Sequence, residues 1–191
     1  MKVYNTDPEN YLNKQEFSLL MKMMKLIIAL LLLLPQFTFA QEYLVKEPDS
    51  KATTYKSWAN QCETDPNTEN KICYSSQTIL VKGKDAEILY IAIGHIPDSD
   101  KPLLRMTTPL GTLLPEGMLI QVDDGEESRL PYVFCNRIGC HIEVGVTDKF
   151  LTAIKKGSKL KIRFLDLGGR EFVVPVSLSG FTKAYNALEK S

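Results

Sequence analysis

The sequence has no net charge and little of the chemistry that enzymes use. Its 23 lysines and arginines balance 23 aspartates and glutamates over 191 residues, and it contains only two histidines. A neutral chain has no strong positive field to hold phosphate backbones, so we expect no nucleic-acid partner. The sequence also lacks a Gly-x-Ser-x-Gly motif and a glycine loop followed by Lys-Ser or Lys-Thr. These absences exclude common hydrolase and nucleotide-binding signatures, and we predict neither an enzyme nor a bound cofactor.

One long apolar run is present, near the N-terminus. Lys22 and Lys25 precede residues 26–34, an unbroken run of Leu, Ile and Ala, and Ala40 completes a small-x-small cleavage site. This is the layout of a secretory signal peptide over residues 21–40, cleaved after Ala40. A permanent span needs about 20 apolar residues, roughly twice this run, so we expect no transmembrane anchor after cleavage. No cysteine follows the run closely, which excludes a bacterial lipoprotein anchor.

The segments on either side of the signal peptide are expected to lie outside the folded domain. Residues 1–20 include acidic side chains, unlike a short cationic n-region, and we interpret them as a mis-assigned extension ahead of a start between residues 21 and 24. Residues 41–54 are polar, and we expect a flexible leader there. A single domain is therefore expected over residues 55–191.

All four cysteines, Cys62, Cys73, Cys135 and Cys140, follow the predicted cleavage site. An even number in an exported chain indicates disulfides, because the periplasm and the exterior are oxidising. Three pairings are available, and we favour Cys62–Cys73 and Cys135–Cys140 because each closes a short loop, for about 2–3 kcal/mol in the chain-entropy model. Two alternatives stay open: a redox pair at the second site, and a zinc site that includes His141.

The pattern after residue 55 predicts short strands joined by tight turns. About eight strands are expected, over residues 73–81, 86–93, 103–107, 118–122, 130–135, 141–146, 159–165 and 171–178. A helix is expected over 148–156, capped by Thr147 or Asp148 and ended by Gly157, and a second helix follows Ser179. We therefore predict a mainly β fold, an antiparallel sandwich with one short internal helix and one C-terminal helix.

Three groups of side chains are candidates for binding. A cationic cluster is expected either to contact an anionic surface such as lipid head groups or to be a solvated face. Its members are Lys155, Lys156, Lys159, Lys161 and Arg163. His141 and Glu143 share one face of a strand; we favour a solvent-exposed face, with a weak metal site involving Asp123 and Asp124 as the alternative. Trp58, the sole tryptophan, is expected in the core, with a surface anchor as the alternative.

The ordered set of these features resembles the invasion-associated locus B family of secreted bacterial proteins. The residues that carry the resemblance are Trp58, the two cysteine pairs, Pro109-Leu110-Gly111, Leu151 with Gly157, and Ser177-Leu178-Ser179-Gly180-Phe181 with Ala184 and Leu188. The resemblance spans residues 55–188. It implies an immunoglobulin-like β-sandwich, exported to the periplasm or the outer surface, in a family that is associated with virulence through host-cell invasion and has no established catalytic activity.

Three hypotheses about function follow. The first is a non-catalytic exported protein that acts by surface contact with an unknown partner in the envelope or on a host cell. The second is an enzyme, either a thiol–disulfide exchanger through Cys135 and Cys140 or a metal-dependent hydrolase through His141. The third is a passive envelope stability factor.

The mature N-terminus tests the export hypothesis. We expect cell fractionation and intact-mass spectrometry to find a periplasmic or released protein that begins at Gln41, because the signal peptidase cuts after a small residue. Intact protein in the cytosol, with its leader attached and its thiols reduced, would contradict both the export and the disulfides.

Overall fold

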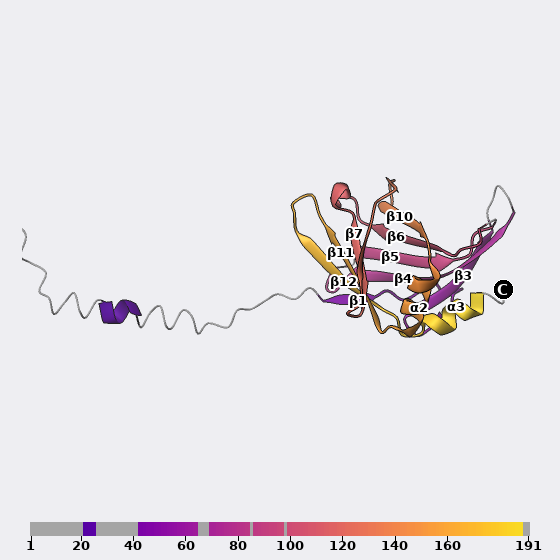
Figure 1. Ribbon diagram of the computed structural model, residues 1–191, viewed down its shortest axis with the longest axis horizontal. Coiled ribbons are helices and arrows are strands. Elements are labelled where there is room, and N and C mark those ends of the chain that lie inside the picture. The colour runs from indigo at the N-terminus through magenta and orange to yellow at the C-terminus, as the bar shows by residue number, and fades with distance from the viewer. Residues whose placement is uncertain (1–20, 26–41, 65–68, 85, 98, 189–191) are drawn as a thin grey trace, which may run out of the picture. The chain divides into compact units, whose positions relative to one another are not determined.

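The structure, a computed structural model, describes residues 21–25, 42–64, 69–84, 86–97 and 99–188 (Figure 1). The chain divides into two units, Met1–Ala40 and Gln41–Ser191. Residues 21–25 of the first unit are helical, and the rest of the predicted signal peptide, its cleavage site and the extension 1–20 lie outside the described residues. Over the described ranges, no helix is both long enough and apolar enough to cross a bilayer.

Eight strands of the second unit form one antiparallel sheet, the large sheet. They are β1 (Tyr43–Val45), β2 (Thr53–Tyr55), β3 (Trp58–Thr64), β4 (Lys71–Val81), β5 (Ala86–Gly94), β6 (Leu103–Thr108), β9 (Phe134–Cys135) and β10 (Cys140–Gly145). The order is β2-β3-β4-β5-β6-β10-β9, and β1 pairs with the end of β4. Most of β2 and all of β1 lie in the segment expected to be a flexible leader, so that segment contributes to the sheet.

A second antiparallel sheet, the small sheet, has four strands. They are β7 (Met118–Val122), β8 (Glu127–Leu130), β11 (Lys159–Leu165) and β12 (Glu171–Ser177), in the order β12-β11-β7-β8, and the 3-10 helix η1 (Leu114–Glu116) precedes β7. The predicted strand 130–135 is wrong as a single strand: β8 ends at Leu130, and β9 joins the large sheet. Pro131 explains the break, because it has no N–H to continue the ladder of β8.

The mainly β fold with two antiparallel sheets, an internal helix and a C-terminal helix is confirmed. The immunoglobulin-like topology is not confirmed. In the large sheet, β3, β4, β5 and β6 follow one another as neighbours in chain order. That part of the prediction stays a prediction.

Both predicted helices form at the predicted positions. Helix α2 (Asp148–Lys156) begins after Thr147, whose hydroxyl accepts a hydrogen bond from Phe150 N, and it ends at Gly157. Helix α3 (Phe181–Leu188) buries all four side chains of its predicted apolar stripe: Phe181, Ala184, Tyr185 and Leu188. The stripe packs the helix against the large sheet and so closes one end of the core.

Trp58 lies in the core, as predicted. Its side chain is 2% exposed, and its ring packs edge-on against Phe181 at 4.9 Å between centroids. The indole Nε1 donates a hydrogen bond to the carbonyl of Ser177, at 2.9 Å. A buried indole needs such a partner, and this one links the start of β3 to the end of β12.

Two disulfides join neighbouring strands. The structure pairs Cys62 with Cys73 across β3 and β4, and Cys135 with Cys140 across β9 and β10, which is the pairing favoured from loop length. In each pair the two residues are directly opposite in register, with Cα atoms 4.0 Å apart. Each bridge therefore reinforces an existing strand pair.

Gly180 provides a test of how α3 docks. It has φ +91°, and a Cβ there would lie 1.9 Å from the carbonyl oxygen of Tyr55; Gly169 has φ +76° with open space around it. We expect Gly169→Ala to lower the free energy of unfolding by about 1–2 kcal/mol, because alanine is strained in the left-handed backbone conformation. Its Cβ would meet no other atoms there. Gly180→Ala should cost about 1–3 kcal/mol more, since the backbone of β2 must move. Equal losses in urea denaturation would show that the close approach does not matter.

Candidate functional site

The outer face of the large sheet carries the candidate site. Alternation along β5 sends Leu89, Ile91 and Ile93 into the core and leaves Tyr90 and Ala92 on the opposite face. The pairing register continues this outer face across the sheet in rows. One row runs through Ala59, Ser76, Ala92, Arg105 and Glu143, and the row beside it runs through Gln61, Tyr74, Gly94 and Leu103.

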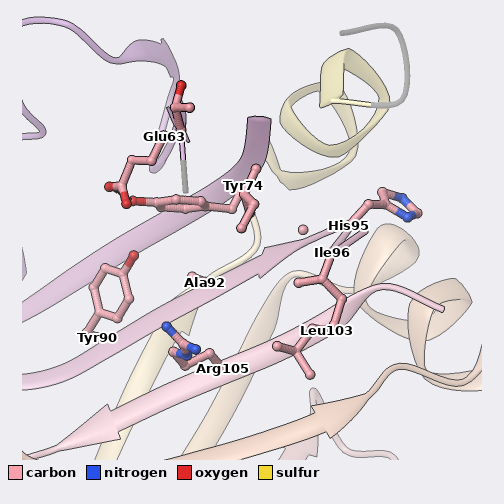
Figure 2. A pocket seen from close by; sticks show the side chains of 11 residues that line it. Glu63, Tyr74, Tyr90, Ala92, His95, Ile96, Leu103 and Arg105 are labelled. Carbon is pink, nitrogen blue, oxygen red and sulfur yellow. Dashed lines mark hydrogen bonds between the residues drawn. The ribbon is translucent and has the colours of Figure 1, made fainter. Parts of the chain in front are cut away.

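A hollow of about 290 Å³ lies where these rows pass over the smallest residues of β5. Ala92 and Gly94 form its floor, and Tyr74, Tyr90 and Arg105 stand around it (Figure 2). A Cβ at Gly94 would lie 2.4 Å from the carbonyl oxygen of Cys73, so the closeness of β4 requires glycine there. The hollow therefore follows from small residues at the centre of the sheet and long ones around them.

The polar groups on one side of the hollow are linked to one another. The Tyr74 hydroxyl donates to a carboxylate oxygen of Glu63 and accepts from the amide of Gln61. Figure 2 shows the Tyr90 hydroxyl pointing toward this pair. Burial, helped by the bond to Glu63, raises the pKa of Tyr74, and burial raises the pKa of Tyr90. Both phenols therefore stay protonated at neutral pH and serve as hydrogen-bonding groups.

The charged group on the other side is Arg105. Its Nε and Nη2 atoms lie 2.8 and 2.7 Å from the same oxygen of Glu143, on the neighbouring strand β10. This contact holds the guanidinium over the sheet while leaving its remaining N–H groups directed elsewhere. The hollow thus has aromatic edges, hydroxyl groups held by hydrogen bonds and a positioned cation around a floor of small residues. Such a site suits recognition of a partner's side chain or a small polar ligand.

His141 lies on the same face, in the row next to that of Ala92 and Arg105. It is buried, whereas the prediction placed it in solvent. It is 6% exposed because Phe134 of β9 stacks on its ring, with centroids 4.6 Å apart. Its Nδ1 lies 2.9 Å from the Thr107 hydroxyl, and its Nε2 is buried with no hydrogen-bond partner in the described part of the chain. The expectation of a solvent-facing histidine was wrong, since β9 covers a position that strand alternation alone leaves open.

The metal alternative gains no support from the described residues, which contain no group of three His, Cys, Asp or Glu side chains placed to hold an ion. Glu143 is engaged by Arg105. Asp123 accepts hydrogen bonds from the backbone N–H groups of Ser158 and Lys159, at 3.0 and 2.9 Å. It ties the β7–β8 turn to the start of β11.

The predicted cationic cluster is divided in the structure. Lys155 lies over the Tyr185 ring, with Nζ 4.4 Å from the centroid. Acidic side chains of the β7–β8 turn and of β8 oppose the cations of β11: Lys161 pairs with Asp124 at 3.3 Å, and Arg163 pairs with Glu127. Lys156 and Lys159 are exposed. Contact of this cluster with an anionic surface stays a prediction, with part of its charge already neutralised.

The second disulfide lacks the usual setting of a redox pair. Cys135 is exposed, whereas Cys140 is 3% exposed, and both lie in strands. A reactive thiol is normally activated at the N-terminus of a helix, where the dipole lowers its pKa. That feature is absent at these two residues, so their arrangement favours a structural bridge.

Tyr74, Tyr90 and Arg105 were missed by sequence reasoning. The available signal was the outward-facing set of the strand over 86–93, where Tyr90 is followed by Ala92 and then by Gly94. A pair of small residues in the middle of a sheet face leaves room that longer neighbours enclose. The sequence did not show that Tyr74 and Arg105 are those neighbours, because this depends on register.

The fold and its two cross-strand disulfides define a small β-rich domain of the kind found outside the cytoplasm, where oxidising conditions keep such bridges. The family model described as "Invasion associated locus B (IalB) protein" matches residues 58–189. The chain belongs to this family, and the resemblance found in the sequence is confirmed.

Individual relatives agree with this assignment. Two invasion protein B homologues of Brucella abortus, from strain 2308 and from biovar 1 strain 9-941, are each 26% identical over 140 residues, which is 71% of this chain and 78% of the relative. The crystal structure of invasion associated protein B from Bartonella henselae is similar with a TM-score of 0.63 and 22% identity. That match covers 74% of this chain and 96% of the other, and it supports the fold.

The buried histidine predicts a pH dependence of stability. Burial lowers the pKa of His141, Arg105 lowers it further, and Glu143 opposes them. The unfolded chain, with an ordinary histidine pKa of about 6.5, therefore binds more protons as pH falls through that value. The free energy of unfolding should fall as the pH is lowered from about 7.5 to about 5.5. The fall should be smaller in His141→Gln, which has no imidazole to protonate. Equal drops in urea titrations of the two proteins would contradict this role.

Proposed function

We propose that the protein acts without catalysis, as an exported binding protein that recognises a partner through the hollow on the outer sheet face, either in the cell envelope or at a host-cell surface. The observation that carries the proposal is that the polar groups of the hollow are positioned in advance. Tyr74 is held by Glu63 and Gln61, and Arg105 is held by Glu143. A site whose side chains are already ordered loses less conformational entropy on binding.

Family membership supports a role in contact with host cells. The relatives carry names that refer to invasion, a process in which bacterial and host surfaces come into contact. The signal-peptide pattern over residues 21–40 and the two disulfides favour a periplasmic or secreted protein. A purely passive stability factor would not need a hollow lined by ordered aromatic and charged groups.

The test uses one variant that fills the hollow and one that removes its charged group. In Ala92→Leu the larger side chain occupies the floor, and Arg105→Gln removes the cation. The exported protein, labelled with a fluorophore, is titrated against detergent-solubilised membrane proteins from bacterial envelopes and from host cells, so that no bilayer is present. We expect saturable binding to one of them and a loss of at least about tenfold in affinity in each variant, equivalent to about 1.4 kcal/mol.

Val173→Thr is the matched control, because Val173 is a half-exposed β residue on the small sheet. It should bind like the wild type, and all variants should keep the thermal midpoint within a few degrees of it. Absence of saturable binding by the wild type, or unchanged binding by Ala92→Leu, would refute the proposed site.

A further inference from the structure

Three aliphatic side chains protrude from the loops at one end of the sheets. Ile138 is 80% exposed, Leu167 is 72% exposed and Leu110 is 59% exposed. Ile138 belongs to the β9–β10 loop, Leu167 to the β11–β12 turn and Leu110 to the turn after β6. Single exposed aliphatic residues are common, but three on separate loop tips need an explanation if they lie together.

The three tips are neighbours. Leu110 and Ile138 line one hollow of about 430 Å³, and Leu110 and Leu167 line a second of about 490 Å³. Leu167 N donates a hydrogen bond to the carbonyl oxygen of Gly111 at 2.8 Å, so two of the loops are bonded directly. Figure 1 shows the β11–β12 turn at the same end as η1, which follows the turn of Leu110. They form one surface, which we term the apolar tips.

The Ile138 loop is held in its protruding position. The Cys135–Cys140 bridge closes its base, and the Asn136 side chain accepts hydrogen bonds from Ile138 N and Gly139 N at 2.8 and 3.3 Å. A Cβ at Gly139 would lie 2.3 Å from the carbonyl oxygen of Thr108, so the loop rests directly on β6. Ile138 therefore cannot be hidden by a small movement of its loop.

The Leu167 turn is fixed in a similar way. Asp166 accepts hydrogen bonds from Gly168 N and Arg170 N, each at 2.9 Å, and its carboxylate pairs with the Arg170 guanidinium at 3.0 Å. That guanidinium also lies over the Phe172 ring, 4.6 Å from its centroid. Both loops thus keep an aliphatic side chain in water with a cation near it, Arg137 for Ile138 and Arg170 for Leu167.

The charge around the tips favours an anionic partner. Arg137 shares the first hollow, and Lys84 and Arg170 share the second. The carboxylates that line these hollows are engaged: Asp166 with Arg170, and Glu87 with Lys46 at 2.5 Å. No carboxylate among the described residues pairs with Arg137. The surface therefore offers aliphatic groups at its summit and positive charge at its sides.

We propose that Leu110, Ile138 and Leu167 dock the protein onto an anionic phospholipid bilayer. Aliphatic tips enter the boundary between head groups and acyl chains, and the flanking Arg137 and Lys84 meet the phosphates. A fluid bilayer accommodates three separate protrusions, whereas a folded protein partner would need a matching socket for each. This surface uses residues other than those of the sheet hollow, so the two proposals stand or fall separately.

Vesicle sedimentation tests the docking. The exported protein is used, with the same N-terminus confirmed by mass spectrometry in every variant. Vesicles of phosphatidylcholine alone are compared with vesicles containing about 30% phosphatidylglycerol, at physiological salt. We expect binding to the anionic vesicles and at least about a tenfold loss in the triple variant Leu110→Ser/Ile138→Ser/Leu167→Ser. Arg137→Gln should lose less, and its binding should depend less on salt.

The matched control replaces three exposed aliphatic residues elsewhere, Leu44→Ser/Val45→Ser/Val173→Ser, and should bind like the wild type. The hollow variant Ala92→Leu should also bind vesicles normally. No binding by the wild type, equal binding to both vesicle types, or unchanged binding by the tip variant would overturn the proposal. A dimer in sedimentation velocity that the tip variant abolishes would assign the surface to a second copy and also overturn it.

Discussion

The large sheet buries one of its two faces, and this packing sets the positions of the side chains on the other face. Ile91, Met106 and Ile142, on neighbouring strands, point into the core that is shared with the small sheet and α3. Because successive side chains alternate between faces, this packing fixes the opposite set as well. A slip of one residue would exchange the two sets, so the core specifies the register that places Tyr90 and Arg105 on the outer face.

The distribution of charge shows why a neutral chain still has distinct surfaces. Asp124 of the β7–β8 turn and Glu127 of β8 pair with Lys161 and Arg163 of β11, so the densest run of cations in the sequence loses part of its field. Arg105 is likewise paired, but on a face where small residues leave a hollow beside it. Recognition here depends on local arrangement, because salt screens exposed charges beyond about one Debye length, roughly 8–10 Å.

Sequence reasoning succeeded where the signal is local. The cap at Thr147, the apolar stripe of α3 and the β11–β12 hairpin each follow from residues a few positions apart. It failed at residues 130–135, where Pro131 ends one strand and the chain crosses to the other sheet. It also failed at His141, because the covering ring of Phe134 comes from a separate strand.

Local sequence signals are enough to assign the class of the protein: a β-rich, disulfide-containing domain with two short helices and a recognisable family. Periodicity, caps and cysteine spacing are properties of neighbouring residues, so they can be recognised without knowledge of the fold. The residues that surround the hollow, and the loop tips that share a surface, become known only when the chain is folded. Those groupings depend on strand register and loop packing between distant segments, for which a single sequence carries no local signal.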